Sequence, residues 1–160
     1  MVDGKNLARS VVSDDWMIVL SVDPLALPAK EKAEAALEVL RTLRPKADEH
    51  ELHLADTPHF FDCGGNYEAV FCPFCETDIG KWALDAIGAW WESADRRDLS
   101  AKTPCCGRPT SLNDLDYVWP QGLACVGFEL MNGGPDLEPE ERQRVEDALG
   151  LPVRVIWRHI

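Results

Sequence analysis

Residues 124–157 read ACVGFELMNGGPDLEPEERQRVEDALGLPVRVIW, and this stretch contains the pattern of a complete β-α-β unit. Apolar side chains alternate through residues 124–131 and again near the end of the stretch, which predicts a strand at each end. The NGGP sequence of residues 132–135 predicts a loop after the first strand. Pro139 suits the first turn of a helix and Gly150 suits its C-terminal boundary, so we expect a helix between these two residues.

The same order of elements is expected nearer the N-terminus. Apolar residues alternate between Trp16 and Val22, which predicts a strand, and a helix with an apolar stripe is expected from Pro28 to about Leu43. A further strand is predicted at residues 51–55. Two β-α-β units in one chain are typical of the ferredoxin-like split β-α-β sandwich, so we expect an α+β fold of this kind. An irregular α+β sheet that holds the same elements in another order is the alternative.

The two units are separated by residues 56–120, which we expect to form an insertion within a single domain spanning residues 1–160. A strand is predicted at residues 67–71, and a helix from Asp78 to about Asp95. Apolar residues occupy a wide arc of this helix, wider than the stripe of a helix with one buried face. We therefore expect the helix to be covered on more than one side.

Four of the six cysteines lie in two short segments of the insertion. The first is Cys72-Pro73-Phe74-Cys75, whose two-residue spacing lets two thiolates bind one ion from a tight turn. The second is Pro104-Cys105-Cys106-Gly107, in which the proline and the glycine favour a sharp turn. Four thiolates make a closed tetrahedral site that selects zinc. We therefore predict a zinc-knuckle insertion with one structural zinc ion, bound by Cys72, Cys75, Cys105 and Cys106.

The side chains of adjacent residues tend to diverge, so Cys105 and Cys106 reach one ion only if the turn bends strongly. If one of them cannot, Cys63 or His59 is the expected substitute ligand. Buried thiols and a redox-active Cys-x-x-Cys pair are the alternative explanations for the cluster. Simple burial is expected for Cys125, which has no partner at a ligand spacing. For the first cysteine pair, the presence of the second pair favours metal binding over redox chemistry.

Four motifs follow one another along residues 65–122, in the order GNYE, CPFC, PCCG and SLNDLDYVWPQG. This succession resembles a group of uncharacterised bacterial zinc-knuckle proteins, over roughly residues 60–160. The resemblance implies a bacterial source and a four-cysteine site, and it implies no particular activity, substrate or partner. Glu76 departs from the pattern, because glycine is common directly after the second cysteine of such a turn. A less regular first turn is therefore expected.

Polar residues near these motifs are candidates for a small-molecule pocket, and they are Asn66, Glu68, Asn113, Asp114 and Tyr117. An enzyme with a pocket near Asn66, Glu68 and Asn113 is the alternative to a binding protein. Polar residues that brace a metal-binding turn would explain Asn66 and Glu68 equally well. Ser111 and Asp114 stand at the spacing of a capped turn, which favours a structural role for that segment.

No catalytic constellation is predicted. The HELH segment at residues 50–53 lies in a stretch expected to be extended, whereas a zinc protease needs its two histidines one turn apart on one helix. The glycine pairs do not belong to a phosphate-binding or dinucleotide-binding loop. His59, Asp62 and Cys63 form no pattern that fixes the geometry of a nucleophile and its helpers.

The composition indicates a soluble binding protein with an acidic surface. The chain has 28 acidic and 16 basic residues among 160, which gives a formal net charge of −12. Apolar residues make up 46% of it, which disfavours disorder, and the lack of a basic field disfavours nucleic-acid binding. We expect a non-catalytic module that binds another protein, for example as an acidic inhibitor, immunity protein or adaptor.

No targeting or membrane segment is expected. Met1–Asn6 lacks the basic and then apolar pattern of a signal peptide. The longest apolar runs, such as Trp16–Leu20, are far shorter than the about 20 residues needed to span a bilayer. A cytoplasmic location is therefore expected, and disulfides are not expected in such a reducing compartment.

Overall fold

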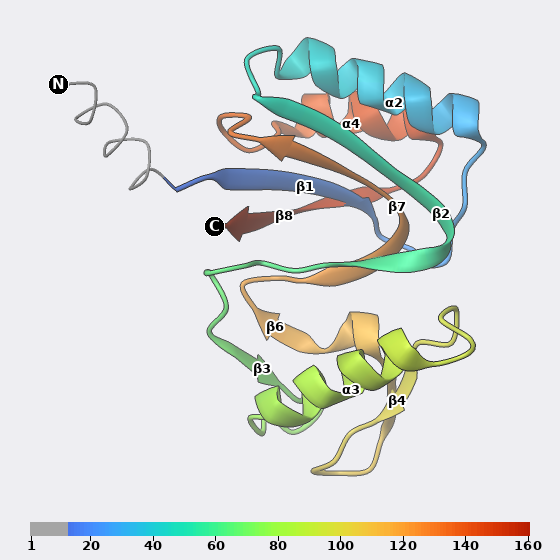
Figure 1. Ribbon diagram of the computed structural model, residues 1–160, viewed down its shortest axis with the longest axis vertical. Helices are drawn as coiled ribbons and strands as arrows, with labels where there is room; N and C mark the ends of the chain where they lie inside the picture. Colours follow the sequence, from blue (N-terminus) through green and yellow to red (C-terminus); the bar gives the residue numbers. More distant parts are fainter. Residues whose placement is uncertain (1–12) are drawn as a thin grey trace, which may run out of the picture.

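The computed structural model describes residues 13–160 and shows an α+β protein with an antiparallel sheet (Figure 1). Residues 1–12, including the Met1–Asn6 segment, lie outside the described part. The α+β class expected from the sequence is confirmed. The main sheet and its helices are built, in chain order, from β1 (Asp15–Ser21), α2 (Lys30–Leu43), β2 (Glu49–Phe61), β7 (Gly122–Met131), α4 (Pro139–Leu149) and β8 (Val153–His159).

The four strands form one sheet in the order β2-β7-β1-β8, and every neighbouring pair is antiparallel. Helices α2 and α4 both cover the same face of this sheet (Figure 1). Their apolar stripes and the alternate residues of the strands meet in a common core. This core includes Met17, Val19, Leu40, Val126, Phe128 and Leu149.

Local sequence explains where α4 begins and ends. Pro139 is its first residue, and Glu138 and Glu141 form a reciprocal capping box with the backbone. Gly150 ends the helix with a φ of +78°, a conformation that glycine adopts without strain. The helix predicted between Pro139 and Gly150 is therefore confirmed.

Strand β2 is much longer than the predicted residues 51–55. It follows β7 as far as Phe61, with a register shift between Leu54 and His59 at the point where both strands bend. At the end of β2, the ring of Phe61 lies over Gly127, where a Cβ atom would come within 2.4 Å of the ring. The insertion therefore begins later than the sequence indicated, because the bend lets pairing continue past the irregularity.

Residues 62–121 form the insertion, which lies beyond the sheet face that α2 and α4 leave free (Figure 1). It contains β3 (Ala69–Phe71), α3 (Gly80–Glu92), β4 (Ser100–Lys102), β5 (Pro109–Ser111) and β6 (Asp116–Val118). Strand β3 pairs with β6 and β4 pairs with β5, both antiparallel. The predicted strand and helix are confirmed, whereas the β4–β5 hairpin was not predicted. Within residues 13–160, the helices are too short or too polar to cross a membrane.

Candidate metal centre and neighbouring sites

Two short turns of the insertion carry the four clustered cysteines. The first turn follows β3, and the second connects β4 to β5. In the first, the backbone N–H of Cys72 donates to the carbonyl of Thr77 at 2.8 Å, and that of Glu76 donates to the carbonyl of Cys72 at 3.0 Å. In the second turn, the backbone N–H of Thr103 donates to the carbonyl of Arg108, and that of Gly107 donates to the carbonyl of Thr103, each at 3.0 Å. The two turns therefore share one backbone pattern, with Thr103 in the place of Cys72.

This correspondence explains the adjacent cysteines of the second turn. Cys106 takes the position that Cys75 has in the first turn, whereas Cys105 takes the position of Phe74. The Thr103 hydroxyl, at the place of the first turn's leading cysteine, lies 3.2 Å from Cys106 Sγ. The second turn thus supplies its two sulfurs from successive residues and keeps a hydroxyl where a third sulfur would fit.

The residue after the second cysteine is in the left-handed region in both turns. The φ of Gly107 is +67°, and that of Glu76 is +63°. The first turn is therefore as regular as the second, and the irregularity expected from the sequence is wrong. Its backbone adopts the glycine conformation with a glutamate, at a cost in strain.

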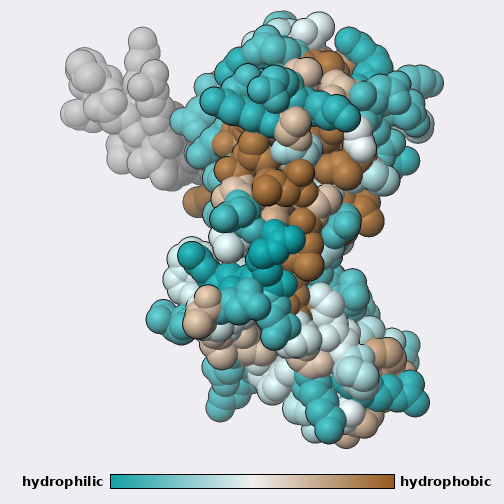
Figure 2. Space-filling model, turned by 90° about the vertical axis from the view of Figure 1, so that its right-hand side faces the viewer, coloured by the Kyte–Doolittle hydropathy of each residue, from teal (hydrophilic) through white to brown (hydrophobic). Residues whose placement is uncertain are grey.

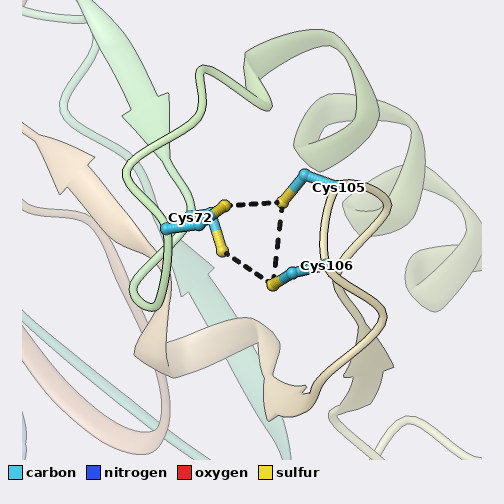
Figure 3. Close-up of side chains that lie close together, drawn as sticks. Cys72, Cys105 and Cys106 are labelled. Atoms are coloured by element: carbon cyan, nitrogen blue, oxygen red, sulfur yellow. Dashed lines mark hydrogen bonds between the residues drawn. The ribbon is translucent and has the colours of Figure 1, made fainter.

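The four sulfur atoms lie at distances that suit one metal ion. Cys106 Sγ lies 3.7 Å from Cys72 Sγ and 4.0 Å from Cys105 Sγ. Cys75 Sγ lies 3.3 Å from Cys105 Sγ, and all four atoms are within 4.8 Å of one another. Zinc–sulfur bonds of about 2.3 Å place the corners of a tetrahedron about 3.8 Å apart, whereas a disulfide needs about 2.0 Å. The cysteines are free thiols that face one another from opposite turns (Figure 3), and they could bind one metal ion.

Neighbouring donors set the pKa values of these thiols. The hydroxyl of Thr77, 3.2 Å from Cys75 Sγ, and the backbone N–H of Thr77 lower the pKa of Cys75 to about 6. Burial opposes ionisation of Cys72, but the backbone N–H groups of Cys75 and Phe74 outweigh it and lower the pKa of Cys72. Burial and the nearby sulfurs raise the pKa of Cys105 to about 12. A bound divalent cation would supply the charge needed to hold all four as thiolates.

The two substitute ligands considered from the sequence lie elsewhere. Cys63 is buried, with its Sγ 3.4 Å from Oε1 of Gln121. His59 stacks on His53 with ring centroids 4.6 Å apart. Both adjacent cysteines of the second turn therefore belong to the cluster. Cys125 is buried in β7, as expected.

Asn66 and Glu68, two of the residues expected near a pocket, each bond to a neighbouring segment. Asn66 Nδ2 donates to the carbonyl of Trp157 in β8 at 3.4 Å. Glu68 accepts from the indole N–H of Trp119 at 3.2 Å. Both bonds connect the start of the insertion to other parts of the chain.

The segment that contains Asn113 and Asp114 is a capped turn, as predicted. Ser111 Oγ accepts from the backbone N–H of Asn113 at 3.2 Å, at the start of a short 3₁₀ turn. Asn113 Oδ1 accepts from the backbone N–H of Leu123 at 2.8 Å, which joins this turn to the start of β7. The side chain of Asp114 is exposed.

A pocket of about 320 Å³ opens between α3 and the end of β2. Of the five residues expected near a pocket, Tyr117 alone lines this one, and its hydroxyl donates to the carbonyl of Leu112 at 2.6 Å. The other polar lining residues are Asp62, Tyr67 and Gln121. No local pattern in the sequence connects these three, because the pocket is formed by segments that are distant along the chain.

An ionic network lies on the sheet face opposite the two helices. Glu129 of β7 is 5% exposed, and its carboxylate lies 2.7 Å from His53 Nε2 and 2.6 Å from Arg158 Nη2. Burial would raise the pKa of Glu129, but His53 and Arg158 outweigh it and lower the pKa. The hydrogen bond to Glu129 raises the pKa of His53. A glutamate within an otherwise apolar strand was the only sequence signal of this network.

Helix α3 has apolar residues on two sides. One side packs against the insertion's own core through Ala83 and Trp90. The other side carries the residues that we term the α3 stripe, Leu84, Ile87 and Trp91, which share one helical face. Leu84 is 72% exposed and Trp91 is 54% exposed. Arg96 lies over the ring of Trp91, 4.8 Å from its centroid, and Ile87 packs in part against the insertion's core, so Leu84 and part of Trp91 are the apolar surface that this side leaves exposed.

A further exposed apolar area lies where β2 and β7 bend. Figure 2 shows hydrophobic residues across the middle of this side of the molecule, broken by hydrophilic ones, between the helical layer and the insertion. The connection from β1 to α2 runs along this side (Figure 1), and its Val22 and Leu27 are about half exposed. The exposed apolar residues of this connection do not form a regular row like that of the α3 stripe.

Comparisons of the chain with protein-family models, with curated proteins and with solved structures found no match. The resemblance to bacterial zinc-knuckle proteins therefore stays a prediction. The geometry of the cysteine cluster and of the α3 stripe is the basis for a functional proposal.

Proposed function

We propose that Cys72, Cys75, Cys105 and Cys106 hold one structural zinc ion. The sulfur spacing and the lowered pKa values of Cys75 and Cys72 support a site for a thiophilic divalent cation. Four sulfur donors would complete a tetrahedral shell without an open position, which suits a structural role. The ion would fasten the turn after β3 to the β4–β5 hairpin.

Metal analysis of the purified chain tests this proposal. We expect about one zinc per chain after purification without chelators, and loss of the metal in Cys72→Ser. Cys125→Ser, at a buried cysteine outside the cluster, is the matched control and should keep the ion. A wild-type protein without bound metal would overturn the proposal.

We infer that the main sheet and its helices form a ferredoxin-like sandwich that the zinc-knuckle insertion interrupts. The order β2-β7-β1-β8 supports this inference, because the strands of each β-α-β unit are separated by one strand of the other unit. The position of both helices on one face of the sheet also agrees with a ferredoxin-like sandwich (Figure 1). The insertion enters between β2 and β7, which are antiparallel neighbours and would otherwise need only a short connection.

We propose that the protein is a non-catalytic module that binds another protein through the α3 stripe. The exposure of Leu84 and Trp91 in one row is the observation that carries this proposal. Large apolar side chains aligned on an uncovered helix face are typical of protein interfaces, and Trp is prominent among residues that dominate binding energy. A metal-fastened insertion would present this row on a rigid support, which lowers the entropic cost of association.

The charge of the chain indicates the kind of partner. A formal net charge of −12 makes two copies of this chain repel each other and attracts a basic protein. Glu92 lines the same hollow as Trp91, and Arg96 lies 4.8 Å over the Trp91 ring, so charges of both signs lie beside the apolar row and the attraction rests on the net charge of the chain. A basic partner suits an acidic inhibitor, immunity protein or adaptor, whose electrostatics speed association.

Affinity capture with surface variants tests this function. We expect the wild-type protein to retain a stoichiometric basic protein from cells of its source, and Leu84→Asp and Trp91→Asp to lose it without losing their folded circular-dichroism spectra. Leu27→Asp, at a leucine 51% exposed in the connection from β1 to α2, should retain the partner. Equal capture by all variants, or capture of a metabolite without a protein, would contradict the proposal.

The alternative, an enzyme with a pocket near Asn66, Glu68 and Asn113, has no comparable observation in its favour. These three side chains make separate hydrogen bonds with different parts of the chain and do not line the pocket beside α3.

A further inference from the structure

We propose that the pocket between α3 and the end of β2 binds a small, uncharged molecule that is mainly apolar and carries one hydrogen-bond acceptor. This proposal does not rest on protein binding by the α3 stripe, although Leu84 and Ile87 belong to both the stripe and the pocket wall. The pocket, at about 320 Å³, is at the lower end of the size range of small-molecule sites, and it lies where the insertion meets the main sheet. Its walls are formed mostly by the apolar residues Phe60, Val70, Ala83, Leu84 and Ile87.

Gln121 supplies a hydrogen-bond donor for such a ligand. Its side chain lines the pocket, and the residue is 7% exposed. The backbone N–H of Cys63 donates to Oε1 of Gln121 at 3.1 Å, and the Cys63 thiol lies 3.4 Å from the same oxygen. Because the amide oxygen must face this donor, the NH₂ group faces away from Cys63; within residues 13–160 it has no hydrogen-bond partner and it keeps some contact with solvent. A free donor on a nearly buried residue, open to the pocket, favours a ligand that brings an acceptor.

The other polar groups at the pocket determine the charge of the ligand. The carboxylate of Asp62 is engaged by Arg158 at 2.7 Å, and the hydroxyl of Tyr117 already donates to the backbone. Tyr67 Oη lies over Gly80, where a Cβ atom would come within 2.8 Å of it, so a larger residue at position 80 would displace the hydroxyl. The pocket therefore offers two neutral groups, the amide of Gln121 and the hydroxyl of Tyr67, and no free charge.

A matched pair of probes tests the proposal on the metal-loaded full chain. Acetophenone is flat and carries one carbonyl acceptor, and isopropylbenzene has nearly the same shape with a methyl group in place of that oxygen. In a ¹H–¹⁵N NMR titration, we expect acetophenone to shift the side-chain NH₂ resonance of Gln121 and to bind about threefold to tenfold more tightly than isopropylbenzene.

Three variants complete the test. Gln121→Glu keeps an oxygen for the Cys63 N–H but removes the NH₂ donor, and it should abolish the preference between the probes. Ile87→Trp fills the pocket from a partly exposed position and should abolish binding of both probes. This variant keeps the proposal testable if Gln121→Glu does not fold. Leu27→Ala, which lies outside the pocket, should change neither the binding of the probes nor the preference between them.

Two results would overturn the proposal. One is the absence of saturable shifts at the pocket residues with either probe up to its solubility limit. The other is equal affinity for the two probes, which would mean that the pocket only accepts apolar groups, such as a side chain of a protein partner.

Discussion

Thr103 stands in the second cysteine turn where Cys72 stands in the first, since both residues make the same two backbone hydrogen bonds. The Thr103 hydroxyl lies 3.2 Å from Cys106 Sγ, which is close enough for a sulfur at this position to join the cluster. Position 103 is therefore a potential ligand position that this chain fills with oxygen, while Cys105 supplies the fourth sulfur.

Moving the fourth sulfur from residue 105 to residue 103 should preserve the metal site. We expect Cys105→Ser alone to lower zinc affinity by about tenfold or more, since even changes outside the ligand shell have effects of this size. Adding Thr103→Cys should restore much of the loss by giving the second turn the same ligand spacing as the first. Competition with a chromophoric chelator measures both affinities, and a double variant no better than Cys105→Ser would contradict the correspondence between the turns.

Glu76 should be replaceable by glycine with a gain in stability. Its φ of +63° is strained for any residue with a Cβ atom, and its side chain is exposed. Glycine relieves this strain, but it also gains more freedom in the unfolded chain, which offsets part of the effect. The net result should be a rise in the free energy of unfolding of about 0.5–1 kcal/mol. Gly107→Ala, at a φ of +67°, should lower it by about 1 kcal/mol. Urea unfolding of the zinc-loaded proteins measures both, and a loss in Glu76→Gly would refute the prediction.

Gly127 should tolerate no larger residue, because the ring of Phe61 lies against it. A Cβ atom at this position would come within 2.4 Å of the ring, so Gly127→Ala should destabilise the protein by about 2–3 kcal/mol. Gly88→Ala is the matched control, because α3 leaves open space around Gly88, and it should stabilise by up to about 1 kcal/mol. Thermal or urea unfolding separates the two, and similar stability of both variants would count against the close packing.

Stability should depend on pH through His53 and Glu129. The pKa of His53 is raised from 6.5, so its contribution is complete below 6.5 and is lost as pH rises through the raised value. The pKa of Glu129 is lowered from 4.5, so its contribution is complete above 4.5 and is lost as pH falls through the lowered value. Their pair therefore stabilises most between these limits.

His53→Gln tests this dependence. The loss of unfolding free energy relative to the wild type should be larger at about pH 6 than at about pH 9. The difference between the two proteins removes pH effects that they share, including those of the cysteine cluster. The same loss at both pH values would show that His53 acts by packing rather than by charge.

Removal of the metal should loosen the insertion and spare the main sheet. The insertion has its own core around Val70 and Trp90, separate from the core beneath α2 and α4. We expect a chelator to speed hydrogen exchange in β3, α3 and the β4–β5 hairpin while β1 and β8 stay protected. Mass-spectrometric exchange measures this, and equal deprotection of β1 would show that the two parts unfold together.

Much of the secondary structure followed from patterns within single elements. Alternation of apolar residues and the helix boundaries at Pro139 and Gly150 are local properties, so the C-terminal β-α-β unit was predictable with the bounds of its helix and to within two residues at the ends of its strands. The spacing of Cys72 and Cys75 is equally local, which is why four candidate ligands could be named before any geometry was known. The full length of β2 could not be predicted, because pairing beyond Leu54 depends on the bend that it shares with β7.

The sequence by itself therefore determined the order of the strands and helices of the main sheet, the acidic charge and the four cysteines. Only the tertiary structure decided that both adjacent cysteines face the first turn, since that depends on how the β4–β5 hairpin lies against β3. It also decided that His53, Glu129 and Arg158 meet from three different strands, and that Leu84 and Trp91 remain largely exposed. The physical reason is the same in each case: the period of a pattern tells which side chains share a face, whereas what covers that face is set by contacts between distant parts of the chain.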